Sequence, residues 1–382
     1  MQFETSRAFE HIDRLSYEIG PRVSGTRGER LSADYIERCL RSTGIEVRRQ
    51  PFTFTDKRAR ERTFAVMLTA AFLVSPLLSP LVSAPVWLSL LALSILSPFP
   101  RRGGLNLIAR IPGRGPPLAL SAHHDTAGPA ERGRTPHAVI LSAATAAILI
   151  RPLVHPWLAL WAPVAALLAA STVNIFRDGR SSPGANDNAS GVAVLLEVAR
   201  CVAGEQNRPD LYLLFTGGEE FGQTGMRHLV RSGILPRGLP ILNVDTVGYG
   251  GQAYYVEGNG LRKNVRTSEE MNRRLAEAAA RLSIEIRPWW SARSNQDHVE
   301  AIRAGHPSTT LTFDSPKAPP DREAVKSGLR NARRSAYRWI HTPDDLPDKL
   351  DPATVEMAGN LVLELLLGEF KRGAQDDLEV RK

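Results

Sequence analysis

The residues in this sequence that could carry out chemistry are histidines and carboxylates, and several stand directly after short apolar runs. His123 and Asp125 follow residues 118–122, Glu219 and Glu220 follow 211–215, and Asp245 follows 241–244. Asp187 opens a helical pattern, and His341 precedes the last long one. That many carboxylates in one place would repel one another and raise one another's pKa values unless cations lay between them. The set therefore predicts a metal centre.

The donor atoms indicate which metal this centre would take. Nitrogen and oxygen ligands without thiolates suit a catalytic zinc site, with cobalt and manganese as alternatives. A carboxylate shared by two ions about 3.5–4 Å apart would give a two-metal centre, which lowers the pKa of water toward about 7. Taken singly, each residue is explained more readily by a surface turn, a loop or a helix cap. The ordered set, with each member at the end of its own element, predicts the site.

Alternating strand-like and helical patterns must position these residues, and they predict an α/β fold with a mixed sheet. The predicted strands are 46–54, 105–111, 118–122, 211–215, 241–244, 253–256 and 309–313. The predicted helices are 6–19, 27–43, 189–202, 225–231, 269–282 and 352–367. Open α/β sheets place their sites beyond the carboxyl ends of the strands, which is where the candidate ligands stand.

Five motifs occur in a fixed order: SAHHDT, GANDNASG, TGGEEFGQTG, NVDTVGYG and HTPDD. Together with the opening IGPRVSGTRGER, this series resembles that of the clan MH zinc aminopeptidase family, which includes leucyl aminopeptidases, glutamate carboxypeptidases and glutaminyl cyclases. The resemblance covers most of the chain outside two apolar insertions. It implies a three-layer α/β/α zinc-exopeptidase fold and two zinc ions per chain.

The resemblance also implies a role for each residue. One zinc would be held by His123, Asp187 and Asp245, and the other by Asp187, Glu220 and His341, with Asp187 bridging. Asp125 would accept the remaining N–H of His123 and fix its tautomer. Glu219 would be the general base. Asp297 and His298 resemble a Ser-Asp-His element near the substrate pocket, with Gln296 in place of the serine.

The implied reaction is hydrolysis of a terminal peptide bond. A peptide with a free N-terminus is the favoured substrate because one zinc can bind a free α-amine. Two alternatives stay open: a glutaminyl cyclase-like acyltransferase with a single zinc, and an inactive receptor or scaffold with a peptidase fold. Complete ligand sets for two metals argue against both alternatives. The preferred side chain and the oligomeric state are not predicted.

Two apolar stretches interrupt this otherwise charged sequence. Residues 63–100 contain no charged residue or histidine, and residues 138–176 contain only Arg151 and His155. We expect each stretch to form a helical hairpin, so that one catalytic domain comprises 1–62, 101–137 and 177–372, followed by a disordered tail at 373–382. A hairpin returns the chain to the side it left, which keeps His123 and Asp187 together.

The net charge of +8 is compatible with a nucleic-acid or a membrane partner, and its placement favours a membrane. Basic residues flank both insertions, whereas residues 79–85 within the first carry no charge. The positive-inside bias then predicts a cytoplasmic catalytic domain. The polar opening and the 2 cysteines, which we expect to be reduced thiols, agree with that location.

Each hairpin arm would be shorter than the ~20 residues of a full span. Spanning helices, re-entrant hairpins and a buried dimer interface therefore all stay open.

Overall fold

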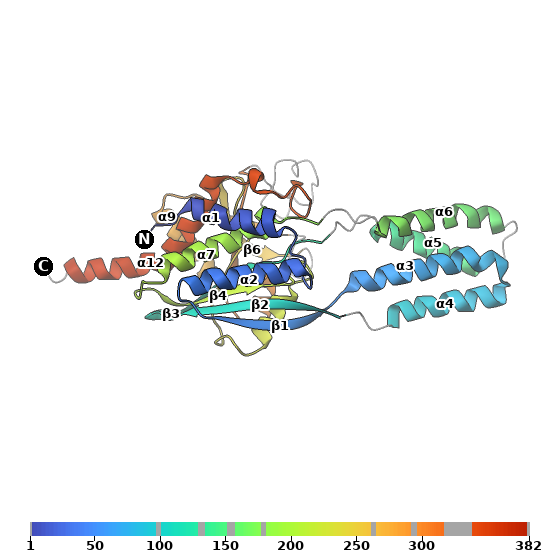
Figure 1. Ribbon diagram of the computed structural model, residues 1–382, viewed down its shortest axis with the longest axis horizontal. Helices are drawn as coiled ribbons and strands as arrows, with labels where there is room; N and C mark the ends of the chain where they lie inside the picture. The colour runs from blue at the N-terminus through green and yellow to red at the C-terminus, as the bar shows by residue number, and fades with distance from the viewer. Residues whose placement is uncertain are drawn as a thin grey trace. The chain divides into compact units, whose positions relative to one another are not determined.

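The computed structural model describes residues 2–96, 101–128, 134–150, 157–176, 181–260, 265–291, 296–316 and 338–379. The chain divides into two units (Figure 1). The first, which we call the α/β unit, comprises Met1–Phe54, Gly103–Gly128 and Ser181–Lys382. The second, the four-helix unit, comprises Thr55–Arg102 and Pro129–Arg180. Both stretches expected to form hairpins, 63–100 and 138–176, lie within the four-helix unit.

A single mixed sheet forms the centre of the α/β unit. Its strands are β1 (Val47–Thr55), β2 (Arg101–Ile111), β3 (Gly115–His123), β4 (Pro209–Thr216), β5 (Ile241–Val244), β6 (Gln252–Asn259), β7 (Val265–Arg266), β8 (Ile286–Ser291) and β9 (Ser308–Asp314). They lie in the order β1-β2-β4-β3-β5-β9-β6-β7, and β8 pairs with β6. The neighbours β4, β3, β5 and β9 are parallel, whereas β2 and β6 pair antiparallel with β4 and β9. The predicted α/β class with a mixed sheet is therefore found.

Helices cover both faces of this sheet. One face packs against α1 (Thr5–Asp13), α2 (Arg27–Ser42), α7 (Ser190–Val202), α9 (Glu269–Arg281) and α12 (Pro352–Glu379). The other packs against α8 (Thr224–Arg231) and α10 (His298–Arg303). The strands serve both cores because successive side chains point to opposite faces. In β3, Leu118 and Leu120 belong to the larger core, and Ala119 belongs to the smaller.

Strand register brings the carboxyl ends of β3, β4 and β5 to the same edge. His123 pairs with Thr216, so Glu219 and Glu220 follow at the level of His123. Ser121 pairs with Asn243, which puts Asp245 opposite His123. Parallel pairing thus gathers residues that lie more than a hundred positions apart in the chain.

Several elements differ from the predictions. The short strands β7 and β8 are not among the predicted elements, and helix α1 continues into a wider turn, η1 (Arg14–Ile19). Helix α12 runs to Glu379 and so includes residues 373–379, which the sequence predicts to be a disordered tail. Ala374, Gln375 and Leu378 are good helix formers, so the helical pattern can continue past Gly373.

The four-helix unit consists of α3 (Lys57–Val74), α4 (Pro80–Leu96), α5 (Arg134–Ile150) and α6 (Trp157–Phe176). Each helix contacts two of the others in the cycle α3–α4–α5–α6, as Figure 1 shows. A short turn, η2 (Ser75–Leu77), joins α3 to α4. Pro85 lies inside α4.

Within the part of the chain that the structure describes, no helix is both long enough and apolar enough to cross a membrane. Of the three alternatives that the sequence leaves open, spanning helices are therefore not found there. Helices α3, α4 and α5 have 18, 17 and 17 residues, fewer than the ~20 that a span needs. Helix α6 has 20 residues, and polar Ser171, Thr172 and Asn174 occupy its last turns.

Candidate metal centre

Asp187 lies in an irregular segment, η4 (Ala185–Ala189), that leads into α7. Asp187 itself has a non-helical backbone with φ −118° and ψ 88°, and its peptide bond to Asn188 is cis. Gly184 before it has φ +63°, and a Cβ there would lie 2.4 Å from the carbonyl oxygen of Asp187. Only glycine fits this turn, which presents the Asp187 carboxylate at the sheet edge.

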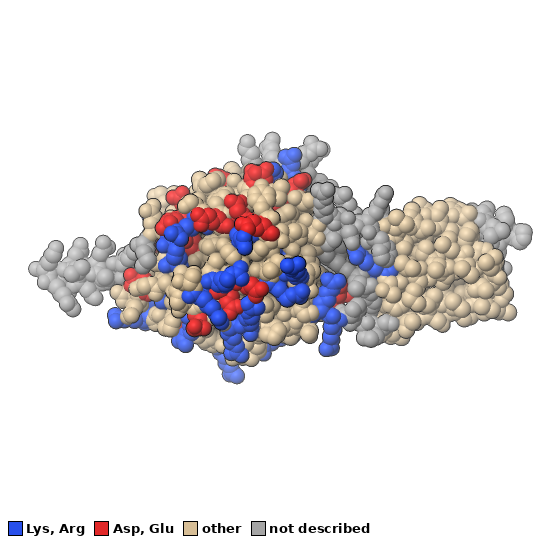
Figure 2. Space-filling model, in the orientation of Figure 1, with Lys and Arg blue, Asp and Glu red and all other residues tan. Residues whose placement is uncertain are grey.

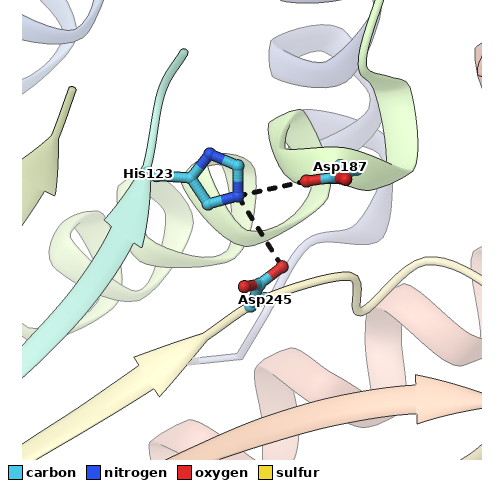
Figure 3. Close-up of side chains that lie close together, drawn as sticks. All are labelled: His123, Asp187 and Asp245. Atoms are coloured by element: carbon cyan, nitrogen blue, oxygen red, sulfur yellow. Dashed lines mark ion pairs between the residues drawn. The ribbon is translucent and has the colours of Figure 1, made fainter. Parts of the chain in front are cut away.

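The five predicted ligands come together in two sets that share Asp187. His123, Asp187 and Asp245 form one set, and Asp187, Glu220 and His341 form the other, with the candidate ligand atoms of each set within 4.8 Å of one another. In the first set, Nε2 of His123 lies 3.1 Å from Oδ1 of Asp187 and 3.7 Å from Oδ1 of Asp245 (Figure 3). The ring lies at the end of β3 and points between the two carboxylates (Figure 3).

The second set uses the other oxygen of Asp187. Nε2 of His341 lies 2.9 Å from Oδ2 of Asp187 and 3.3 Å from Oε1 of Glu220. His341 has φ +60°, an uncommon conformation for a residue with a side chain. Its side chain is 55% exposed, whereas those of His123 and Asp187 are buried. The shared aspartate therefore stands between an enclosed histidine and an accessible one.

The electrostatics of the two sets fit a bound cation. Burial opposes protonation of His123, yet contacts with Asp125, Asp187 and Asp245 raise its pKa well above the ordinary value. Burial likewise disfavours the charged form of His341, but Asp187 and Glu220 raise its pKa to about 10. Burial would raise the pKa of Asp187, but hydrogen bonds from the two histidines lower it overall. Protons on the histidines thus balance the carboxylates, and metal binding would release those protons.

Glu220 supplies the clearest sign that a group from outside the chain belongs here. Its Oε1 is buried and accepts no hydrogen bond from the described residues, although Nε2 of His341 lies 3.3 Å away as an ion-pair partner. Burial, followed by repulsion from Asp187, raises the pKa of Glu220 to about 8. A buried carboxylate oxygen without a hydrogen-bond donor is costly unless a cation contacts it. Oxygen and imidazole donors in this arrangement suit zinc.

Glu219 is buried beside this pair of sites. Its backbone N–H donates to Oδ1 of Asp125, and its Oε1 accepts a hydrogen bond from Nε2 of Gln223 at 3.1 Å. Burial raises the pKa of Glu219 well above its ordinary value, His123 counteracts this, and Glu220 adds to it. A carboxylate with a raised pKa next to a metal centre is suited to accept and return a proton near neutral pH.

Asp125 contacts His123 differently from the prediction. Nδ1 of His123 lies 3.1 Å from the backbone carbonyl oxygen of Asp125, whereas the carboxylate Oδ1 lies 3.5 Å away. The carbonyl is therefore the hydrogen-bond acceptor for this ring. The carboxylate accepts hydrogen bonds from Ser24 Oγ and from the N–H of Glu219. It thus connects the loop that carries Glu219 to the N-terminal segment.

Asp297 and His298 lie in the first turn of α10 and are fully buried. Thr216 Oγ1 donates to one carboxylate oxygen of Asp297, while the other oxygen has no hydrogen-bond partner among the described residues. Burial raises the pKa of Asp297 to about 7. Both ring nitrogens of His298 are engaged, with Thr310 at 2.6 Å and Asn259 at 2.5 Å. These contacts give His298 a packing role, and its contact with substrate stays a prediction.

Arg22 is a site residue that reasoning from the sequence missed. Its guanidinium is fully buried and donates to the carbonyl oxygens of Leu15, Gly20, His124, Pro183 and Gly184 at 2.7–3.3 Å. Burial lowers its pKa to about 10, so it stays charged at neutral pH. These bonds join the loop after β3 to the loop before Asp187. The opening motif contains Arg22, but its partners are backbone atoms that no residue type indicates.

Asp345 in the HTPDD motif has a similar positioning role. Its two carboxylate oxygens accept the backbone N–H groups of Asn186 at 2.8 Å and Asp187 at 3.2 Å. Burial raises its pKa to about 7. The segment that supplies His341 therefore also fixes the segment that supplies Asp187.

Histidines and carboxylates gathered at the carboxyl ends of parallel strands, with an adjacent buried glutamate, define a metallohydrolase type of centre. The chain belongs to peptidase family M28, whose model matches residues 106–366. The predicted resemblance to the zinc aminopeptidase family is thus confirmed, and the protein is a hydrolase of that family.

Individual relatives agree with this assignment. Aminopeptidase YwaD of Bacillus subtilis (strain 168) is 24% identical over 419 residues, which cover 97% of this chain and 86% of the relative. The zinc aminopeptidase BSAP from Bacillus subtilis has a similar structure, with a TM-score of 0.58 and 17% identity over 95% of this chain and 94% of that one. Glutaminyl cyclase from Porphyromonas gingivalis also gives a TM-score of 0.58, with 18% identity over 95% and 97%. At these identities, the two structures show that the fold is shared.

Proposed function

We propose that this protein is a zinc aminopeptidase with two ions per active site. The observation that carries the proposal is the position of Asp187, whose two carboxylate oxygens face His123 at 3.1 Å and His341 at 2.9 Å. His123, Asp187 and Asp245 would hold one ion, and Asp187, Glu220 and His341 the other. When bound, zinc would polarise the scissile carbonyl and lower the pKa of a water molecule.

Glu219 would act as the general base. Its carboxylate would take a proton from the attacking water and return it to the amine that leaves. The raised pKa of Glu219 supports this role, because its carboxylate must hold the proton taken from water and then release it near neutral pH. Asp125 positions Glu219 by accepting its backbone N–H at 3.1 Å. These contacts support Glu219 as the proton carrier beside the proposed ligands.

Peptides with a free N-terminus are the proposed substrates. Two relatives described as aminopeptidases, one similar in sequence and one in structure, support this choice. A glutaminyl cyclase-like acyltransferase is the competing hypothesis, because glutaminyl cyclases share the fold. Such an enzyme would need only one zinc, whereas both candidate sets in this chain are complete. An inactive scaffold would be expected to have lost ligands, and all five are present.

A panel of fluorogenic aminoacyl amides tests the proposal on detergent-purified, full-length protein, with zinc content measured per chain. We expect two zinc ions, hydrolysis of at least one amide, and loss of activity with a chelator. Glu219→Gln should keep the metal but lose about 10²–10⁴-fold in kcat. Glu257→Gln is the matched control because Glu257 lies on β6 and is 48% exposed.

Two results would contradict the proposal. If zinc-loaded protein hydrolyses no aminoacyl or peptide substrate, the peptidase assignment for this chain fails. If it binds one zinc and cyclises an N-terminal glutamine, the acyltransferase hypothesis replaces it.

A further inference from the structure

The four-helix unit carries most of the exposed large apolar side chains that the structure describes. Of 17 such residues, 14 lie in this unit. Leu81 is 87% exposed, Leu77 84% and Leu96 79%. On the face that Figure 2 shows, this unit is covered almost entirely by uncharged residues, while blue and red side chains gather on the α/β unit. Soluble monomers rarely expose contiguous apolar surface on this scale.

Helix α4 shows the pattern most clearly because it has no polar face. Only Ser83 and Trp87 of this helix are buried. The exposed positions include Leu81, Val82, Val86, Leu88, Leu93, Ile95 and Leu96, which spread over about half of the helix circumference. A helix that is apolar all round requires apolar surroundings on all sides. The bundle supplies them on one side only.

The interior of the bundle combines an apolar core, which includes Leu68, Phe72 and Trp87, with several buried polar side chains. Its buried residues include Thr69, Ser75, Ser83, Ser171 and Thr172, together with four alanines. Thr69 and Thr172 share a hydrogen bond of 2.7 Å between α3 and α6, and Trp87 Nε1 donates to Thr145 Oγ1 at 3.1 Å. Hydrogen bonds within the bundle and small residues at helix contacts are what a lipid environment requires, because lipid offers polar groups no partner.

The sequence at the ends of the apolar stretches adds charge complementarity. Residues 56–62, 101–102, 130–134 and 177–180 contain 10 Lys and Arg against 4 Asp and Glu. Residues 63–96, which form most of α3 and α4, contain no charged residue. Basic residues beside an apolar surface suit the anionic headgroups of a bilayer.

We propose that the outer surface of the four-helix unit binds a lipid bilayer, with acyl chains covering its exposed aliphatic side chains and anionic headgroups contacting the exposed Arg101. Acyl chains can cover this surface without any single helix crossing the membrane. A second copy of the chain suits the surface less well, because the exposed apolar residues stand on α3, α4 and α6 and not on one face.

Flotation of the full-length protein with vesicles tests this inference. We expect the wild-type protein to float with vesicles of phosphatidylcholine and phosphatidylglycerol. The double variant Leu77→Glu/Leu81→Glu should bind at least about ten-fold more weakly, because each change puts a charge where acyl chains would lie. Arg101→Gln should weaken binding to anionic vesicles by about five-fold and leave binding to neutral vesicles unchanged.

The matched control is Leu31→Glu/Leu282→Glu, which adds the same charges to residues of the α/β unit that are 39% and 37% exposed. This control should float like the wild type. Wild-type protein that stays at the bottom as a detergent-free monomer by light scattering would overturn the inference. A detergent-free oligomer that Leu77→Glu/Leu81→Glu dissociates would also overturn it, in favour of a second copy as the partner. Neither outcome depends on peptidase activity.

Discussion

The α/β unit and the four-helix unit differ in the kind of polar group they bury and in the surface they expose. The α/β unit buries charged side chains, including His123, Asp187 and Asp245, and exposes polar surface elsewhere. The four-helix unit buries threonines and serines that hydrogen-bond to one another or to nearby backbone, and it exposes leucines such as Leu81. Buried charge requires a partner that neutralises it, and exposed apolar surface requires one that covers it. The α/β unit therefore indicates a partner that neutralises its buried carboxylates, and the four-helix unit indicates one that covers its exposed apolar side chains.

The largest expected effect comes from removing the shared ligand of the α/β unit. Asp187→Ala should remove both zinc ions and lower kcat/KM at least about 10³-fold, because each set of donors loses a carboxylate oxygen. Asp245→Ala, which touches one set only, should spare the other ion. Elemental analysis and the aminoacyl-amide assay measure both effects. Two zinc ions retained by Asp187→Ala would show that Asp187 does not bridge.

A smaller effect separates positioning of the site from stability of the unit. Arg22→Met should lower the free energy of unfolding by about 3–5 kcal/mol, because it removes the buried donor of five carbonyl oxygens, of which, within the described residues, only those of Leu15 and Gly184 keep a backbone N–H donor. Zinc affinity should also fall about 10–100-fold, because these carbonyls belong to the loops around the ligands. Denaturant unfolding and zinc titration measure the two quantities.

Arg208→Met is the matched control for Arg22→Met. Arg208 is 2% exposed and donates to the carbonyl oxygens of Val202, Ile111 and Pro209. It lies at the start of β4, the end away from the ligands. We expect a comparable loss of stability with unchanged zinc affinity. If both variants lose zinc affinity equally, Arg22 stabilises the α/β unit but does not specifically position the metal centre.

The sequence predicts that the candidate ligands lie close together, because their positions depend on strand ends and register. His123, Asp245 and Glu220 each follow an apolar run, and parallel pairing of those runs brings them together. Asp187 needs more than that, because it lies in an irregular turn. Only the ordered motif series indicates that it reaches the same edge.

Contacts to backbone atoms and short elements could not be predicted from residue types. The five acceptors of Arg22 are carbonyl oxygens, and the acceptor for His123 is the carbonyl of Asp125 and not its carboxylate. Strand β8 contains Pro288 and two tryptophans and lacks a clear alternation. Helix α10 has 6 residues, too few for a helical period to show.

The two units should also respond differently to pH. Burial lowers the pKa of His298 from its ordinary value of 6.5 to about 3. Between these two pH values, His298 is protonated in the unfolded chain and neutral in the folded chain. His298 therefore lowers stability as pH falls from 6.5 toward 3, by up to about 1.4 kcal/mol per pH unit, and has no effect above 6.5. Hydrogen exchange of metal-free protein should show this slope in the α/β unit.

His298→Gln isolates the contribution of one imidazole, since glutamine can still contact Thr310 and Asn259. The free energy of unfolding of His298→Gln should depend less steeply on pH than that of the wild type, by an amount equivalent to the uptake of at most one proton on unfolding. Residues 63–96 contain no titratable side chain, so their protection should not change over the same range once intrinsic exchange rates are corrected. Identical slopes for the wild type and His298→Gln would show that this histidine is not held neutral.

The smallest expected effect lies in the interior of the four-helix unit. Thr69→Val should lower its stability in vesicles by about 1 kcal/mol, because it leaves the buried Thr172 hydroxyl without its partner. Thr69→Val/Thr172→Val should recover part of that loss, since neither side chain then needs a partner. Ser94→Ala, which removes a hydroxyl bonded only to Leu91 of its own helix, is the control. Hydrogen exchange of α3 and α6 measures the coupling between the two threonines. If the effects of Thr69→Val and Thr172→Val simply add in the double variant, this hydroxyl pair does not couple α3 to α6. The polar residues inside the four-helix unit would then be buried without connecting its helices.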